Sequence, residues 1–177
     1  MRAAGHEECS FALSMTTQPL HHGPVFADHS AGVPTRAEAY IALLGRVLFS
    51  VVFIAVTPAH FSGDTIRYAA DHGVPLAEIL VPAAGILALA GGLSILTGFK
   101  ARTGAWLLVL FLVPVTVAMH NFWTISDPAA AQVQQAMFMK NLGLLGAALL
   151  VAYFGAGPAS IDRIAHGPAR ASRFGQI

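Results

Sequence analysis

Four long apolar runs constrain the fold of this chain more than any other feature of its sequence. They cover about residues 37–59, 75–98, 104–121 and 133–154. Runs of this length can cross roughly 30 Å of hydrocarbon as α-helices. None alternates as a membrane β-barrel strand does, and none shows the polar stripe of a helix on a soluble bundle. We therefore predict an all-α fold, an integral membrane four-helix bundle over residues 36–158.

The composition agrees with a surface that faces lipid. Hydrophobic residues make up 55% of the 177 residues and charged residues 11%, whereas a soluble domain carries about 25% charged residues. The net charge of +1 argues against a nucleic-acid binder, which would carry a basic patch. The single cysteine, Cys9, has no partner for an intrachain disulfide. The partner that the composition indicates is the lipid bilayer.

Lys and Arg residues in the short loops predict the orientation of the bundle. Lys100 and Arg102 lie between the second and third runs. Further arginines lie at the start of the first run, Arg36 and Arg46, and after the fourth, Arg163, Arg170 and Arg173. The opposite ends hold only Arg67 and, at the margin of the fourth run, Lys140. We therefore predict that the N- and C-termini are cytoplasmic.

Two segments outside the runs are predicted to be tails. Residues 1–35 are mixed and polar, with no apolar stretch long enough for the core of a signal peptide. We expect them to form a disordered cytoplasmic tail, in which Met15 is an alternative start to Met1. Residues 159–177 are expected to form a second cytoplasmic tail. The histidines of the first tail lack regular spacing, so we predict no metal site.

Arg46 and a row of small residues stand out within the runs. Arg46 lies about two turns into the first run, where a charge is unfavourable unless its stem reaches the interface or it pairs with a group inside the bundle. Both possibilities remain open. Ala84, Ala88 and Gly92 recur every four residues, a spacing that lets membrane helices approach closely. We predict that this face packs most tightly.

Polar and aromatic residues gather at the predicted outer ends of the runs. They are His60, Glu78, His120, Asn121, Trp123, Lys140 and Asn141. His and Lys can donate hydrogen bonds to the carbonyl groups of a quinone, and aromatic side chains can flank its ring. These residues are thus a candidate site for a quinone headgroup. The alternative is that Lys140 extends to the interface, Glu78 interacts with a helix dipole and the histidines are hydrated.

Five segments occur in one order between about Arg46 and Asp162. They read GRVLF at 45–49, GGLSILTG at 91–98, HNFW at 120–123, FMKNLGLLG at 138–146 and GAGPASID at 155–162. In this order they resemble the DoxX family, which consists of small four-helix bacterial membrane proteins. Many members have Lys where His60 stands. Many also carry a Glu near the position of Ala88, and this chain lacks that carboxylate.

The resemblance implies a role beside redox enzymes. We expect an accessory subunit of a quinone-linked redox or oxidative-stress complex, with other membrane redox subunits or a second copy as partners. Any enzyme activity would belong to the quinol or quinone oxidoreductase complex as a whole. The alternative is a membrane scaffold without ligand chemistry that docks a partner through Ala84, Ala88 and Gly92. A small transporter is the least supported hypothesis, because the four spans hold no strong intramembrane charge.

Overall fold

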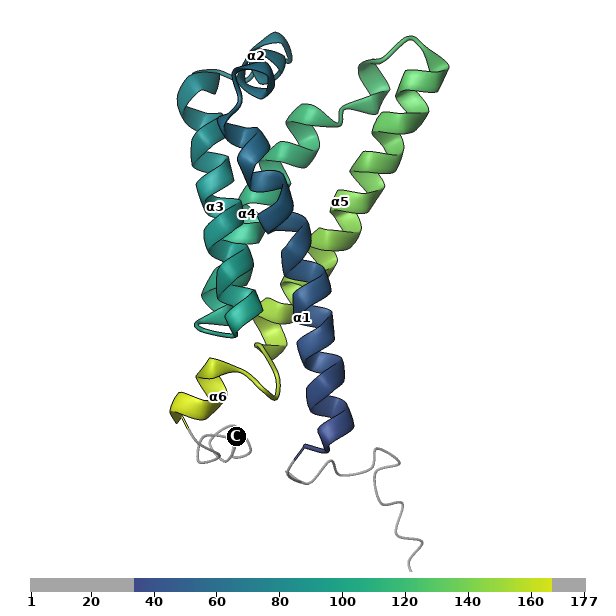
Figure 1. The fold of residues 1–177 in the computed structure, drawn as a ribbon. Coiled ribbons are helices and arrows are strands. Elements are labelled where there is room, and N and C mark those ends of the chain that lie inside the picture. The colour runs from purple at the N-terminus through teal and green to yellow at the C-terminus, as the bar shows by residue number, and fades with distance from the viewer. Residues whose placement is uncertain (1–33, 167–177) are drawn as a thin grey trace, which may run out of the picture. The chain divides into compact units, whose positions relative to one another are not determined.

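The described chain is a set of long helices that run up and down. A computed structural model describes residues 34–166 (Figure 1). The α-helices are α1 (Arg36–Val56), α2 (Gly63–Asp71), α3 (Ala77–Thr97), α4 (Ala101–Met119), α5 (Pro128–Phe154) and α6 (Ile161–His166), and the short 3₁₀ helices are η1 (Thr57–Phe61) and η2 (Phe122–Thr124). Four stretches are long and apolar enough to cross a membrane: Arg36–Phe61, Ala77–Thr97, Ala101–Thr124 and Pro128–Phe154. The predicted all-α, four-span fold is confirmed.

Capping residues place two helix starts earlier than the apolar runs suggest. Thr35 and Glu38 form a reciprocal capping box that begins α1 at Arg36. The Asp127 carboxylate accepts a hydrogen bond from the backbone N–H of Ala130 at 2.9 Å, and Pro128 suits a first helical position. Helix α5 therefore begins five residues before the predicted run at 133. Its first two turns consist of Pro, Ala and Gln with a single Val, so apolar content alone could not locate its start.

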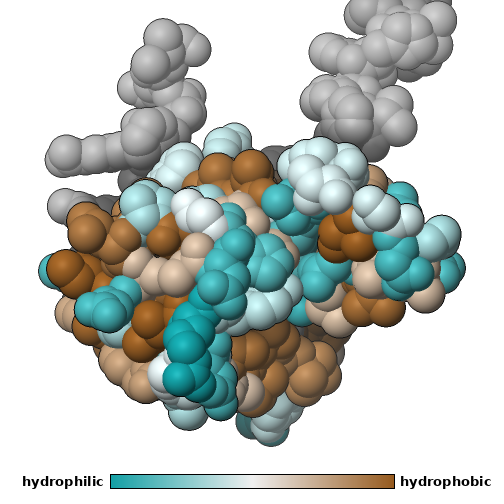
Figure 2. Space-filling view, turned by 90° about the horizontal axis from the view of Figure 1, so that it is seen from above, coloured by the Kyte–Doolittle hydropathy of each residue, from teal (hydrophilic) through white to brown (hydrophobic). Residues whose placement is uncertain are grey.

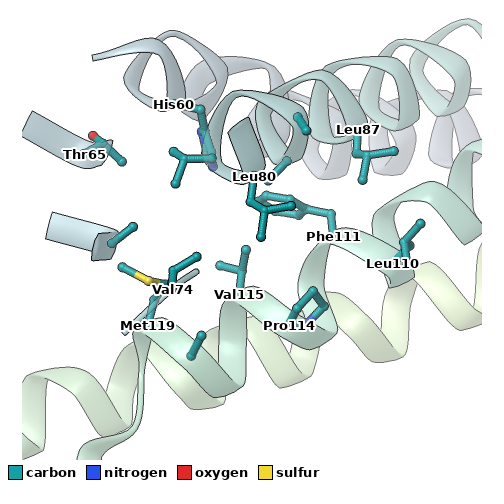
Figure 3. Close-up of a pocket in the computed structure, with 15 residues that line it drawn as sticks. His60, Thr65, Val74, Leu80, Leu87, Leu110, Phe111, Pro114, Val115 and Met119 are labelled. Carbon is teal, nitrogen blue, oxygen red and sulfur yellow. The ribbon is translucent and has the colours of Figure 1, made fainter. Parts of the chain in front are cut away.

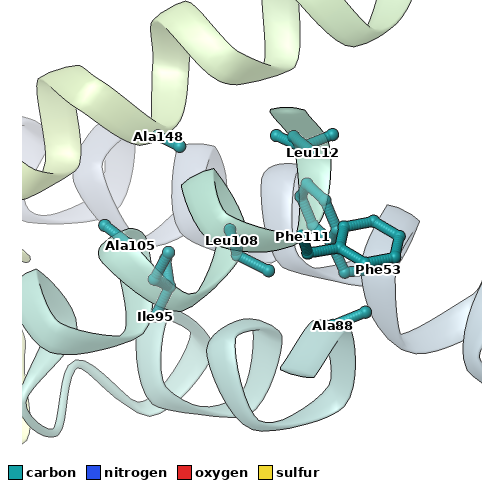
Figure 4. Close-up of a cluster of buried hydrophobic side chains, with 8 residues drawn as sticks. All are labelled: Phe53, Ala88, Ile95, Ala105, Leu108, Phe111, Leu112 and Ala148. Carbon is teal, nitrogen blue, oxygen red and sulfur yellow. The ribbon is translucent and has the colours of Figure 1, made fainter. Parts of the chain in front are cut away.

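The helices pack in the order α1, α3, α4, α5. Helix α1 packs on α3, α3 on α4, and α4 on α5. Their shared core consists of Phe53, Ala88, Ile95, Ala105, Leu108, Phe111, Leu112 and Ala148 (Figure 4). The rings of Phe53 and Phe111 meet edge to face, with centroids 6.2 Å apart. Helix α5 fully buries only Asn141 and Ala148, so the side that does not pack on α4 is left for lipid or a neighbour.

Glycines bring α3 and α4 together near the turn that joins them. A Cβ atom added to Gly91 would lie 2.8 Å from the carbonyl oxygen of Gly104, and one added to Gly104 would lie 2.4 Å from Ser94 Oγ. No side chain fits at either position, so the two backbones are in direct contact. We call this end of the molecule, together with residues 155–162, the closed end.

The predicted small-residue face is used inside the chain. Ala88 has no exposed surface, and Gly92 is buried against α1, where an added Cβ would lie 3.4 Å from the Ser50 carbonyl oxygen. Ala84 is half-buried. The idea that this face docks a partner complex is therefore wrong for Ala88 and Gly92, because the chain's own helices cover them.

The segment after α5 is hydrogen-bonded to the bundle. The Asp162 carboxylate accepts hydrogen bonds from the backbone N–H groups of Lys100 (2.9 Å) and Ala101 (3.2 Å), and its own N–H donates to the Gly98 carbonyl (3.0 Å). It thereby caps α4, since Lys100, at the cap position, offers no side-chain acceptor. The ordered contacts thus extend past the predicted boundary at residue 158. The predicted N-terminal tail lies outside the described residues except for Pro34 and Thr35.

Candidate functional site

Away from the closed end, α3 and α4 separate around a cavity of about 370 Å³ (Figure 3). Residues of η1, α2, α3, α4 and the loop before α3 line it. Its walls are largely aliphatic and aromatic, with Leu80 and Leu87 on α3 facing Leu110 and Phe111 on α4. This volume lies within the range of ~300–1,000 Å³ that small-molecule sites occupy. We call the part of the molecule around the cavity the open end.

Side-chain size and a proline explain why the helices separate here. Leu87 and Leu110 line the seam between the helices, whereas Gly91 and Gly104 line it at the closed end. Pro114, in the C-terminal half of α4, has no N–H to donate to the Leu110 carbonyl. The cavity wall therefore includes Leu110, whose backbone carbonyl lacks its usual N–H donor within the helix.

His60 is the one ionisable side chain among the residues that line the cavity. It is half-buried, and its ring lies 5.6 Å from the ring of Phe111. Gly85 on α3 stands against it, and a Cβ at Gly85 would come within 2.7 Å of His60 Cβ. In Figure 3 the His60 side chain points from η1 toward the space between Val74, Leu80 and Phe111. The fold thus holds one imidazole at the edge of an apolar cavity.

The hydrogen bond of His60 fixes which ring nitrogen carries the proton. Nδ1 lies 3.0 Å from the carbonyl oxygen of Val56, one helical turn earlier. A carbonyl oxygen can only accept, so Nδ1 donates. Nε2 has no hydrogen-bond partner within residues 34–166. In the neutral ring it is therefore an available acceptor.

Helix α2 lies over the cavity on the side of the membrane interface. It begins after Ser62, whose Oγ accepts from the Thr65 N–H at 3.2 Å. Ala69 is 2% exposed and packs with Ala77 and Val81 of α3. Figure 2, seen from this end, shows hydrophilic residues gathered across the end surface with hydrophobic residues around them. The end surface suits water, and the flanks suit lipid.

Three other predicted site residues lie at the junction of α4, η2 and α5. His120 ends α4, and its Nδ1 lies 2.7 Å from Gln134 Oε1 on α5. Asn121 precedes η2. Trp123 is exposed, and its ring meets that of Phe138 edge to face at 5.9 Å. None of the three lines the cavity.

Glu78, Lys140 and Asn141 also lie outside the cavity lining. Glu78 is exposed in the first turn of α3. Lys140 is exposed on α5, with Nζ 3.5 Å from the sulfur of Met137, whereas Asn141 is buried at 7% exposure. The structure therefore brings only His60, of the seven candidates, to the cavity. Helix α5 packs mainly on α4, which keeps its polar residues away from η1 and α3.

Arg46 pairs inside the protein. It is 5% exposed, and its Nη2 donates to the carbonyl oxygen of Ala159 in the segment after α5. Its Nε and Nη1, like the hydroxyl of Ser50 one turn later, have no hydrogen-bond partner among the described residues. Of the two possibilities for Arg46, the structure favours pairing within the bundle over extension to the interface.

The sequence alone did not predict the capping role of Asp162, although the start of α4 offered an indication. Lys100 precedes α4 at a position where Ser, Thr, Asp or Asn is preferred as a cap. A missing local cap suggests a remote one, but only the fold identifies Asp162. Within residues 34–166, no three His, Cys, Asp or Glu side chains are placed to hold a metal ion. The histidines of the predicted tail lie outside the described residues.

Comparisons with known proteins place the chain in a family. The family model for DoxX matches residues 41–121, which include the cavity lining and the turn between α3 and α4. Inner membrane protein YqjF of Escherichia coli is 35% identical over 124 residues, which cover 69% of this chain and 89% of that protein. Inner membrane protein YphA of the same organism is 29% identical over 129 residues, with 72% and 91% covered.

A more distant similarity reaches a yeast protein. ER-derived vesicles protein ERV29 of Saccharomyces cerevisiae is 25% identical over 127 residues, which cover 72% of this chain but 34% of that protein. No solved structure matches the chain significantly. The matches to the family model and to nearly full-length bacterial relatives agree with the four apolar helices. The chain therefore belongs to the DoxX family of multi-pass membrane proteins.

Proposed function

We propose that this DoxX-family protein holds a lipid-soluble ligand of the quinone class in the cavity at the open end. It would do so as an accessory subunit of a quinone-linked redox or oxidative-stress complex in the bacterial inner membrane. The observation that carries the proposal is the 370 Å³ cavity, whose lining is apolar apart from His60 and Thr65. Apolar walls suit a ring and an isoprenoid tail, and one imidazole can orient a polar head.

The cavity lining supports binding more than conversion of the ligand. It offers one imidazole and one hydroxyl, without a carboxylate or thiol beside them. Electron transfer would then belong to the partner subunits, with this protein supplying or sequestering the ligand. The two bacterial relatives are named inner membrane proteins, which supports the proposed location.

A membrane scaffold without ligand chemistry is the second candidate. Helix α5 buries only two of its residues, so it offers a long apolar side to a neighbouring subunit. Under this hypothesis the cavity would have no specific ligand, and loss of the cavity would leave function intact.

Filling the cavity tests the proposal. Purified protein in lipid nanodiscs is titrated with a short-chain benzoquinone analogue, and saturable binding is measured by calorimetry. Ala84 lines the cavity, so Ala84→Phe should abolish saturable binding. Ala90→Phe is the matched control, because Ala90 is exposed on the same helix and lies outside the cavity lining. Absence of saturable binding to the unaltered protein would reject the proposal and favour the scaffold.

A further inference from the structure

Building on the proposed function, we infer that the cavity selects ligands whose head donates a hydrogen bond over carbonyl forms of the same shape. In the quinone class this means the hydroquinone rather than the quinone. The sequence suggested the opposite, with His donating to a quinone carbonyl. The difference comes from the hydrogen bonds around His60 and Thr65, which only the fold displays.

The first step is the direction of the His60 hydrogen bond. Nδ1 donates to the Val56 carbonyl at 3.0 Å, so the neutral ring presents the lone pair of Nε2 as its free polar atom. Phe111 and Gly85 hold the ring in place from α4 and α3. At the edge of the cavity, His60 thus accepts a hydrogen bond and has no proton left to donate.

The second step is that Thr65 has no free proton either. Ser62 Oγ donates its single proton to the Ala59 carbonyl at 2.9 Å. In the 2.9 Å contact between Ser62 Oγ and Thr65 Oγ1, the donor must therefore be Thr65. The other polar side chain of the lining consequently has no proton to donate to a ligand.

The third step concerns the backbone of α4. Pro114 leaves the Leu110 carbonyl without its helical N–H donor, and both residues line the cavity. The lining side chains therefore provide no free donor, and Nε2 of His60 is their available acceptor. A hydroxyl head finds a partner there, whereas a carbonyl head finds none from these side chains.

The mouth of the cavity strengthens this selection, because it faces hydrocarbon. Leu80 on α3 is 45% exposed and Leu110 on α4 is 60% exposed, and both line the cavity within membrane-spanning stretches. Helix α2 covers the interfacial side through Ala69. The hydroxyl of a ligand in hydrocarbon has no hydrogen-bond partner. Water therefore competes little with its hydrogen bond to Nε2.

The test compares matched ligands in nanodiscs under anaerobic conditions. One pair is decyl hydroquinone and decyl benzoquinone, and a redox-inert pair is 4-decylphenol and its methyl ether. One neutral hydrogen bond predicts that each hydroxyl compound binds about fivefold to tenfold more tightly than its partner. His60→Phe keeps an aromatic ring but removes the acceptor, so the preference should fall to within about twofold.

Two further variants separate the role of Nε2 from a loss of folding. Gly85→Ala keeps the imidazole but displaces it, because the new Cβ would lie 2.7 Å from His60 Cβ, and it should weaken the preference similarly. His72→Phe is the matched control, since His72 Nδ1 also contacts a carbonyl one turn earlier, at 2.8 Å from Tyr68 O, but lies outside the cavity lining. It should retain the full preference.

The outcomes distinguish this inference from the proposed function. Equal binding of both members of each pair, or a preference that persists in His60→Phe, would overturn the inference and leave the quinone-class site standing. Failure of all four compounds to bind the unaltered protein would overturn both.

Discussion

The closed and open ends of the α3–α4 pair show how one helix pair can be both tightly packed and hollow. At the closed end Gly91 and Gly104 bring the backbones into contact. At the open end Leu87 and Leu110 stand at the seam around a cavity of about 370 Å³. Because lipid is as apolar as the side chains, membrane helices approach according to residue size at the seam. The glycines therefore mark the place where the two backbones meet.

The polar groups of the two ends differ in the same way. At the closed end Asp162 caps α4 and Arg46 donates to Ala159, so contacts distant in sequence join α1, α4 and the segment after α5. At the open end His60 satisfies one nitrogen within its own turn and leaves the other free. At the closed end Asp162 and Arg46 join segments distant in sequence, whereas at the open end the hydrogen bond of His60 is local and leaves Nε2 available to a ligand.

The largest expected effect concerns which end faces the cytoplasm. Within residues 34–166, five Lys or Arg residues lie toward the closed end: Arg36, Arg46, Lys100, Arg102 and Arg163. Two lie toward the open end, Arg67 and Lys140. This bias predicts a cytoplasmic closed end. In intact cells expressing a Cys9→Ser background, a membrane-impermeant maleimide should label Ser126→Cys and leave Thr103→Cys unlabelled. Both positions are exposed. The reverse labelling pattern would show that the open end, and not the closed end, faces the cytoplasm.

A methyl group at the closed end should loosen the helix pair. Gly91→Ala places a Cβ 2.8 Å from the Gly104 carbonyl oxygen and 2.7 Å from Leu108, and overpacking of this kind costs about 1–3 kcal/mol. Thermal unfolding in detergent should show a lower midpoint. Gly146→Ala is the control, because nothing lies within 4 Å of its new Cβ and alanine is the better helix former. Equal midpoints for the two variants would mean that the backbones are not in contact.

Removing the remote cap should give a smaller loss. Asp162→Ala leaves the N–H groups of Lys100 and Ala101 without their acceptor, and loss of a cap costs ~0.5–2 kcal/mol. The segment after α5 should also become more sensitive to protease. Asp127→Ala removes the local cap of α5, so it should destabilise comparably without this protease sensitivity. Protection of the segment in Asp162→Ala would show that it does not depend on this contact.

The smallest effects are expected where the sequence suggested the strongest ones. His120→Ala and Lys140→Ala alter residues outside the cavity lining, so the affinity for a bound quinone analogue should change by less than about twofold, well under the tenfold that 1.4 kcal/mol would give. The titration in nanodiscs described above measures this directly. A tenfold loss in either variant would place the ligand between α4 and α5 instead of at the open end.

Local patterns predicted the fold well and the site only in part. The four runs identified four spans because length and hydropathy are properties of single segments. The candidate site required polar residues of different helices to meet, and shared depth in the membrane does not imply proximity. His60 and His120 both lie near the same ends of their spans, yet His60 lines the cavity whereas His120 contacts Gln134.

The sequence by itself determined that this chain spans a membrane with four helices and belongs with small bacterial membrane proteins. Hydropathy, capping residues and short motifs are local properties of the sequence, so predictions from them do not require knowledge of tertiary contacts. Only the tertiary structure decided that α3 and α4 open around His60, that Asp162 caps α4, and that His60 leaves Nε2 free at the cavity. Those features depend on distances between atoms of different helices, and the order of residues along the chain does not give these distances.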